Sequence, residues 1–177
     1  MRKVILAVGM SLDGYIARPN GAVDFLFMPK GFSMGPFMRT VDVAIMGRKT
    51  LDVGRKLAGG SFSGPFAANY VFSRSQPPGE REGVIFVNES PAKLLGKLRK
   101  RSGKNIWLMG GGELTRHFLK ADLVDGLYLG IVPVLLGKGI PSFPAGFPQR
   151  DFKLIENKSF SKGLISLTYE RVARKRK

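Results

Sequence analysis

The sequence predicts a three-layer α/β/α protein, in which a mostly parallel mixed sheet is covered by helices on both faces and ends in a C-terminal antiparallel hairpin. Two observations predict this class. Short apolar runs rich in β-branched residues alternate along the chain with stretches of helical spacing, and this alternation is typical of parallel sheets built from strand–helix–strand units. The last two strand-like segments follow one another without a helix between them, as the two strands of a hairpin do.

The first half of the chain contains four predicted strands. Each is an apolar run bounded by turn residues, and they cover Lys3–Met10, Val41–Met46, Asn69–Ser73 and Gly83–Asn88. A short helix is expected over Lys49–Leu57, and the two glycines that follow, Gly59-Gly60, predict its end. Met28–Pro36 predicts a loop over a pocket or a poorly formed helix, and Gln76–Gly79 predicts a loop, because both are rich in Pro and Gly.

The second half opens with the clearest helix signal of the chain. Ser90 is a good N-cap, Pro91 suits the first helical position, and three leucines then fall on one face, so we expect a helix that Gly103 ends. A further helix is predicted over Glu113–Ala121. The strands of this half are expected at Asn105–Met109, at Leu123–Val134 and, as the closing hairpin after the connection Gly137–Pro148, at Phe152–Lys158 and Gly163–Arg171.

The composition excludes several classes of protein. With 177 residues, 44% of them apolar and 24% charged, the chain suits one globular domain, which we place over residues 1–172, and not a disordered or collagen-like chain. It has no cysteine, so disulfides, thiolate zinc sites, iron–sulfur clusters and cysteine nucleophiles are excluded. His117 is the only histidine. We therefore expect no metal site and expect His117 to be structural.

No segment of the sequence has the pattern of a targeting or membrane-spanning element. The apolar run after the basic start is interrupted by Ser11, Asp13 and Gly14, too early for a signal peptide. No run approaches the roughly 20 apolar residues of a membrane span. We therefore expect a soluble, cytoplasmic protein with no membrane partner.

The chain is strongly basic. It has 29 Lys and Arg against 13 Asp and Glu, a formal net charge of +16, and residues 173–177 form a basic tail that we expect to be disordered. Such an excess favours either a polyanionic partner such as nucleic acid or simply solubility. Against nucleic acid, no RNP or helix-turn-helix motif is present, and outside the tail only Lys93–Lys104 concentrates cations.

Two strand-to-helix junctions carry the strongest signal for a ligand. The first, Gly47–Thr50 (GRKT), puts cations and a hydroxyl on the first turn of a helix, where the dipole favours anions. The second, Gly110–Gly112, leaves no side chain between a strand end and the next helix. Neither is a GxxxxGK[ST] loop or a GxGxxG fingerprint. Because ligands gather at the carboxyl ends of parallel strands, an extended dianion could span both junctions.

Four further residues have both a functional and a plainer interpretation. Ser73 and Arg74 end a strand with groups that suit a terminal phosphate, although a solvated loop residue is the plainer explanation for Arg74. Asp13 precedes a glycine just after a strand, where Asp is most often a turn residue. Asp24 lies beside an apolar stretch that could raise its pKa toward proton-donor use, and an N-cap is an equally good explanation.

Five segments together resemble the dihydrofolate reductase superfamily. The resemblance is closer to the reductase domain of the bifunctional riboflavin-biosynthesis deaminase-reductase and its free-standing relatives. Each motif alone is weak, but they occur in the family's order and cover nearly the whole chain: Met10–Ala17 (MSLDGYIA), Ile45–Thr50 (IMGRKT), Val71–Arg74 (VFSR), Ile106–Leu114 (IWLMGGGEL) and Leu135–Phe143 (LLGKGIPSF). Without cysteine there is no deaminase zinc motif, so the resemblance is to the reductase half alone.

The resemblance implies a dihydrofolate reductase-like fold that binds NADPH along the carboxyl ends of the strands. It assigns the adenosine and phosphate portion to the first junction, the 2′-phosphate to Ser73 and Arg74, and the pyrophosphate and nicotinamide side to the second junction. The implied cofactor residues are Gly47, Arg48, Lys49, Thr50, Ser73, Arg74, Gly110, Gly111, Gly112, Glu113 and Leu114. The turn after the first strand would border nicotinamide and substrate, with substrate contacts from Ser11, Ile16 and Phe25 and with Asp13 and Asp24 as candidate catalytic residues.

On this basis the sequence predicts an NADPH-dependent oxidoreductase that transfers hydride to a small heterocyclic or carbonyl-bearing substrate, of pterin or ribosylated-pyrimidine type. A carboxylate or water would supply the proton, with Asp13 the best placed by motif and Asp24 second. A true dihydrofolate reductase or riboflavin-pathway reductase, a basic nucleic-acid-binding protein and an inactive cofactor-binding relative stay open as alternatives. The resemblance also favours a homodimer.

Overall fold

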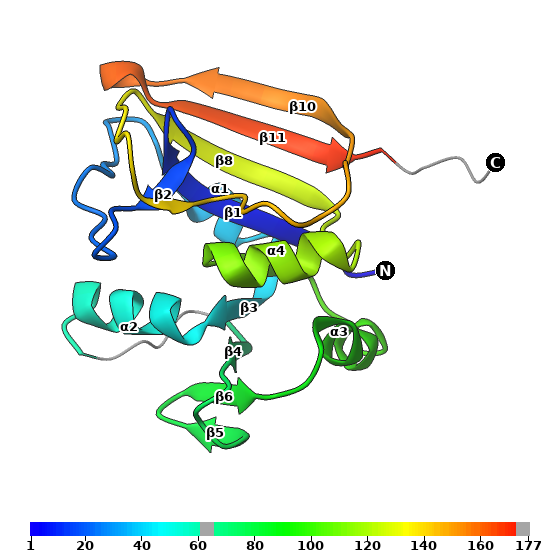
Figure 1. The fold of residues 1–177 in the computed structure, drawn as a ribbon. Helices are drawn as coiled ribbons and strands as arrows, with labels where there is room; N and C mark the ends of the chain where they lie inside the picture. Colours follow the sequence, from blue (N-terminus) through cyan, green and yellow to red (C-terminus); the bar gives the residue numbers. More distant parts are fainter. Residues whose placement is uncertain (61–65, 173–177) are drawn as a thin grey trace.

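A nine-stranded sheet forms the centre of the computed structural model, which describes residues 1–60 and 66–172 (Figure 1). Across the sheet the strands lie in the order β10-β11-β8-β1-β7-β3-β4-β6-β5. In chain order they are β1 (Val4–Ser11), β3 (Val41–Gly47), β4 (Ala68–Phe72), β5 (Gly79–Arg81), β6 (Val84–Val87), β7 (Asn105–Gly110), β8 (Gly126–Val132), β10 (Phe152–Ser159) and β11 (Ile165–Arg171).

The pairing of these strands confirms the predicted mixed sheet. Neighbours from β8 to β6 pair in parallel, whereas β11 pairs antiparallel with β8 and β10, and β5 pairs antiparallel with β6. The C-terminal hairpin therefore closes one edge of a mostly parallel sheet, as expected. The basic tail predicted at residues 173–177 lies outside the described residues.

Helices cover both faces of the sheet, which confirms the predicted three layers (Figure 1). α3 (Pro91–Arg99) and α4 (Gly112–Lys120) pack on one face. α2 (Arg48–Leu57) and the short α1 (Gly35–Met38) pack on the other. Within the two described ranges, no helix combines the length and the apolar character needed to cross a bilayer.

The side chains of β3 show how the two apolar layers are built. Val43 and Ile45 are buried in the layer that contains the leucines of α3 and α4. Ala44 and Met46 are buried instead against Leu51 of α2. Successive side chains of a strand point to opposite faces, so a strand covered on both faces needs apolar residues at successive positions. The apolar run Val43–Met46 reflects that double burial.

The predicted start of α3 is confirmed, and its predicted end is wrong. Ser90 Oγ accepts a hydrogen bond of 3.3 Å from a first-turn amide, as an N-cap does. The helix ends at Arg99 and not at Gly103. Gly103 has φ +152°, and a Cβ there would lie 2.9 Å from Arg2 Cζ. This glycine is needed because the chain passes close to the ion pair between Arg2 and Asp42.

Three short strands lie outside the predicted set. β2 (Tyr15–Ala17) and β9 (Ile140–Pro141) form a separate antiparallel sheet of two strands. β5 begins at Gly79, so the predicted loop at Gln76–Gly79 is wrong at its last residue. Met28–Pro36 is irregular as expected until α1 begins at Gly35. Strands of two or three residues carry too little alternation to be found from sequence.

Candidate functional site

The carboxyl ends of β3, β4 and β7 meet at one edge of the sheet. The parallel register sets Met46 of β3 beside Gly110 of β7, and Gly47 beside Phe72 of β4. Ser73 follows Phe72 directly, so the two glycine junctions and the third strand end lie side by side. The two junctions therefore share one edge, the arrangement in which a single extended ligand could reach both.

The two junctions approach each other closely at their glycines. A Cβ on Gly47 would lie 3.9 Å from Gly110 O, and a Cβ on Gly111 would lie 3.5 Å from Thr50 Oγ1. From a third direction, Ile16 Cδ1 of β2 lies 3.7 Å from that same Cβ position. The peptide bond between Gly110 and Gly111 is cis. The structure thus brings five of the predicted residues together around bare backbone.

Two helices begin at this point with glycine as the N-cap. Gly47 precedes α2 and Gly111 precedes α4, and neither N-cap supplies a side-chain hydrogen bond. The first amides of a helix have no partner within the helix, and a glycine cap leaves them available to an anion. The local geometry therefore favours a phosphate at the junctions.

A cavity of about 260 Å³ continues the site along α2. It is lined by three arginines, Arg48 and Arg55 from α2 and Arg81 from β5, and by Gln76 in the turn after β4. We call it the arginine cavity. Arg48 was predicted from the sequence, whereas Arg55, Gln76 and Arg81 were not, because their approach to one another depends on β5, a strand that was not predicted.

The three arginines keep cationic character in spite of nearby carboxylates. Arg48 pairs with Asp52 at 2.8 Å, and Arg55 pairs with Glu82 at 2.6 Å. Arg81 lies over a phenylalanine ring, 4.8 Å from its centroid, and has no ion pair among the described residues. Three cations against two carboxylates leave the cavity with a charge of +1, which suits a dianionic phosphate better than a neutral group.

Ser73 and Arg74 follow the end of β4 and have different surroundings. Ser73 is buried, and its hydroxyl accepts hydrogen bonds from Gln76 N at 3.0 Å and from Ser75 N at 3.3 Å. Ser73 therefore shapes the turn that carries Arg74. Arg74 is exposed and does not line the arginine cavity.

Three other predicted cofactor residues are less well placed for a direct contact through their side chains. Lys49 and Glu113 are exposed, and Glu113 pairs with Arg116 at 2.6 Å. Leu114 is 9% exposed and belongs to the apolar layer of α3 and α4. Gly112 is buried at the start of α4, where a Cβ would overlap Pro141 O and lie 3.0 Å from Pro144 Cγ.

Asp13 joins two loops at the end of β1. Its carboxylate accepts hydrogen bonds from Ser11 Oγ at 2.6 Å, from Leu136 N at 3.0 Å and from Gly137 N at 2.8 Å. Ser11 is fully buried, and its hydroxyl accepts a 2.9 Å hydrogen bond from Tyr15 N. The connection after β8 is thus fixed to the turn after β1. We call these four residues, Ser11, Asp13, Leu136 and Gly137, the Asp13 anchor.

The hydrogen bonds of the anchor, first that from Ser11, hold the pKa of Asp13 below its ordinary value. A lowered pKa stabilises the folded state above the ordinary carboxyl pKa, and this contribution is lost as the pH falls through the folded-state pKa. We expect Asp13→Asn to speed amide hydrogen exchange at Leu136 and Gly137 at neutral pH, and this difference from wild type to disappear in acid.

Asp24→Asn is the matched control for this prediction, since it also removes one exposed carboxylate. It should leave exchange at Leu136 and Gly137 unchanged. Equal exchange in Asp13→Asn and wild type at neutral pH would show that the anchor does not hold these loops together.

A family model and two curated proteins match nearly the whole chain. The model of the RibD C-terminal domain family matches residues 2–166. The chain belongs to this family. Two curated proteins of Bacillus subtilis (strain 168) are similar along their whole length. The uncharacterized protein YwjB is 35% identical over 173 residues, 96% of this chain and 98% of that protein. The uncharacterized protein YyaP is 32% identical over 178 residues, with 95% and 94% covered.

Solved structures share the dihydrofolate reductase-like fold of this RibD C-terminal domain. A putative riboflavin biosynthesis protein from Shewanella sp. PV-4 is 29% identical, with a TM-score of 0.80 over 97% of this chain and 99% of that one. The diaminohydroxyphosphoribosylaminopyrimidine deaminase/5-amino-6-(5-phosphoribosylamino)uracil reductase from Thermotoga maritima is 18% identical (TM-score 0.73, 97% of this chain, 57% of that chain). A pyrimidine reductase-like protein from Corynebacterium diphtheriae is 17% identical (TM-score 0.71, 98% and 93% covered).

Asp24 is where this RibD domain contradicts the sequence analysis. Arg18 donates from Nε to Asp24 Oδ1 at 2.7 Å and from Nη2 to Oδ2 at 2.9 Å, and holds the pKa of Asp24 below its ordinary value. Asp24 is exposed, and no helix of the described chain begins there. The expected raised pKa and the expected N-cap are therefore both wrong. The turn closed by Arg18 N and Ala22 O, at 2.8 Å, brings the two charges together.

The segment that contains Phe25 crosses the end of β1. Phe25 is half-buried, and the neighbouring Leu26 packs on β1, with Cδ2 3.2 Å from the position of a Cβ on Gly9. Farther along, Phe32 meets Phe160 edge to face at a centroid distance of 5.3 Å. The segment therefore forms a wall between β1 and the turn of the C-terminal hairpin.

In the part of the chain that the structure describes, no group of three or more His, Asp or Glu side chains could hold a metal ion. His117 is exposed on α4 and has no role in the geometry above.

Proposed function

We propose that this RibD C-terminal domain is an NADPH-dependent reductase that acts on a small heterocyclic substrate. The observation that carries the proposal is the meeting of the glycine N-caps of α2 and α4 beside the arginine cavity. A dinucleotide with a terminal phosphate needs both features, because bare amides suit the pyrophosphate and guanidinium groups suit the terminal phosphate.

The residues present fit this cofactor. The amides at Gly111 and Gly112 would hold the pyrophosphate. A side chain at Gly47 or Gly111 would fill the space that the pyrophosphate needs in order to reach these amides. Arg48, with Arg55 and Arg81, would hold the 2′-phosphate in the arginine cavity. When bound, NADPH supplies the hydride.

The protein itself would position the substrate and limit access of water. Ile16 offers an apolar contact at Gly111, and the Asp13 anchor fixes the turn from which β2 continues. Asp13 and Asp24 both have lowered pKa values, so both are ionised at neutral pH and are poor proton donors. Water is then the better proton source, and Asp13 serves the reaction by positioning.

Among substrates, we favour a ribosylated pyrimidine over a pterin. The family match and the name of the Thermotoga reductase support a phosphoribosylamino-uracil type of substrate. A folate-type site needs a carboxylate toward the pterin, and Asp24, a candidate for that carboxylate, is exposed and paired with Arg18. A riboflavin-pathway reductase is therefore the finer form of the proposal.

The test is a titration of the purified protein with NADPH and with NADH, followed by nicotinamide fluorescence. We expect saturable binding with a clear preference for NADPH. A substrate screen then follows the loss of nicotinamide absorbance with pterins and with ribosylaminopyrimidines. Absence of binding, or equal weak binding of the two cofactors, would overturn the proposal.

A further inference from the structure

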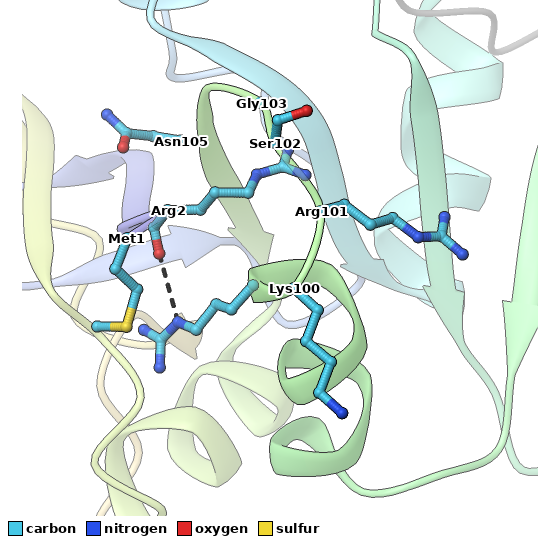
Figure 2. A pocket seen from close by; sticks show the side chains of 8 residues that line it. Met1, Arg2, Lys100, Arg101, Ser102, Gly103 and Asn105 are labelled. Atoms are coloured by element: carbon cyan, nitrogen blue, oxygen red, sulfur yellow. Dashed lines mark hydrogen bonds between the residues drawn. The ribbon is translucent and has the colours of Figure 1, made fainter.

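A second cavity lies at the amino ends of the central strands, opposite to the carboxyl ends that carry the candidate cofactor site (Figure 2). It has a volume of about 370 Å³ and is lined by Arg2, just before β1, by Asn105 at the start of β7, and by the loop that follows α3. The candidate cofactor site lies at the carboxyl ends of these same strands. The two cavities are thus separated by the length of the sheet, and the proposed reductase function makes no use of this one.

The surroundings of this cavity are strongly cationic. Lys93–Lys104 contains six Lys and Arg and no Asp or Glu. Two of the six are neutralised, since Lys97 pairs with Glu89 and Arg99 with Asp125, each at 2.8 Å. The other four are exposed and form no ion pair within residues 1–60 and 66–172. We call them the basic ridge: Lys93, Lys100, Arg101 and Lys104.

Hydrogen bonds to Arg2 fix the backbone of the loop after α3, which carries Lys100, Arg101 and Lys104 of the basic ridge. Arg2 is 8% exposed, pairs with Asp42, and donates from Nε to Lys104 O at 2.7 Å. Arg99 donates from Nε to Arg2 O at 3.3 Å, the dashed line in Figure 2. Both ends of the loop after α3 are therefore tied to the same residue. Cations on a preorganised loop lose less conformational entropy when they bind a partner.

The arrangement of the cations favours a linear polyanion over a single small anion. Lys93 and Lys100 are seven residues apart, so they lie on one side of α3, about 10.5 Å from each other along its axis, with the Glu89-paired Lys97 between them. Figure 2 shows Lys100 and Arg101 extending in different directions from the end of the helix, where a site for one phosphate needs convergent groups. Successive phosphates of a nucleic-acid strand present charges in such a row.

The apolar residues of α3 argue against a membrane surface as the partner. Leu94, Leu95 and Leu98 are all buried against the sheet. A helix that lies on a bilayer needs an apolar face available for the lipid. We propose that the basic ridge binds the phosphate backbone of single-stranded nucleic acid, with one nucleotide unit at the cavity beside Arg2 and Asn105.

This binding should be independent of base sequence. No aromatic side chain belongs to the ridge or lines the cavity in the described part of the chain, so stacking on bases is not expected. Four phosphate contacts on a single strand correspond to a slope of about −2.8 in a plot of log K against log salt concentration.

The experiment compares two double variants that change the net charge equally. Lys100→Glu with Arg101→Glu disrupts the ridge, whereas Lys30→Glu with Lys153→Glu alters exposed cations elsewhere. Binding of a labelled oligouridylate is followed by fluorescence anisotropy over a salt series. We expect the ridge variant to bind about tenfold or more weakly, with a slope smaller by about 1.4, and the control to bind as wild type.

Three results would overturn the proposal. One is an equal loss of RNA binding in both double variants, which would show that only the overall charge matters. Another is no saturable RNA binding by the wild type. The third is binding of phosphatidylserine vesicles without binding of RNA. NADPH titration of the same variants, expected to be unchanged, keeps this test separate from that of the reductase function.

Discussion

Arg48→Ala should weaken NADPH binding by about 10- to 100-fold and leave NADH binding nearly unchanged. Arg48 opens α2 beside Gly47 and lines the arginine cavity, so it is placed to meet a terminal phosphate that NADH lacks. Hydrogen bonds to charged groups contribute about 1.5–3 kcal/mol each, and about 1.4 kcal/mol corresponds to a factor of ten in affinity. Nicotinamide fluorescence titrations of variant and wild type measure the two affinities directly.

Two companion variants locate the phosphate more closely. Arg101→Ala removes the same charge at the opposite edge of the sheet and should change neither affinity. Arg81→Ala tests whether the terminal phosphate binds in the arginine cavity, and Arg74→Ala tests whether it binds at the turn after β4. A greater effect of Arg74→Ala would put the phosphate at the exposed turn after β4. A loss of both NADPH and NADH binding in Arg48→Ala would contradict its assignment to the terminal phosphate.

Gly112→Ala should lower the free energy of unfolding by about 2 kcal/mol, although alanine is the better helix former. The added Cβ would overlap Pro141 O and approach Pro144 Cγ to 3.0 Å. The first of these is a backbone atom of β9, so the strand or the start of α4 must move. We expect the same variant to bind NADPH more weakly, since α4 begins at the proposed pyrophosphate site. Urea unfolding and cofactor titration check the two effects.

Gly96→Ala is the matched control for that substitution. Gly96 also lies in a helix, but a Cβ there would meet nothing within 4 Å. Removing glycine from a helix interior typically stabilises by about 0.5–1 kcal/mol. If Gly96→Ala is stabilised and Gly112→Ala keeps the wild-type free energy of unfolding, β9 can move aside without destabilising the fold, which would contradict the prediction.

The sequence was sufficient for those parts of the fold in which local signals agree with burial. β1, β3 and β7 are long apolar runs because they are buried on both faces, and α3 has a complete start signal in Ser90-Pro91. The glycine junctions could be found as well, because three consecutive glycines have few structural explanations. The meeting of Gly47 with Gly110 followed from parallel register.

The parts that could not be predicted depend on contacts distant in sequence. β9 exists because Ile140–Pro141 pairs with β2 and because Asp13 holds the loop before it, and neither leaves a local periodicity. The arginine cavity forms only when β5 folds back against β6. For Asp24, a signal was available: the Pro-Asn-Gly turn after Arg18 reverses the chain and brings the guanidinium back to the carboxylate.

The place of β1 at the centre of the sheet has a consequence for synthesis. β1 is made before both strands that flank it, since Val4 pairs with Ile106 and Ile5 with Gly126. At a synthesis rate of about 5–20 residues per second, the roughly 100 residues between β1 and β7 take about 5–20 s to make, and β1 has no partner strand during that time. Pairings over such separations also slow folding. The first strand to be made therefore stays without either of its neighbours in the sheet until more than half of the chain has been synthesised.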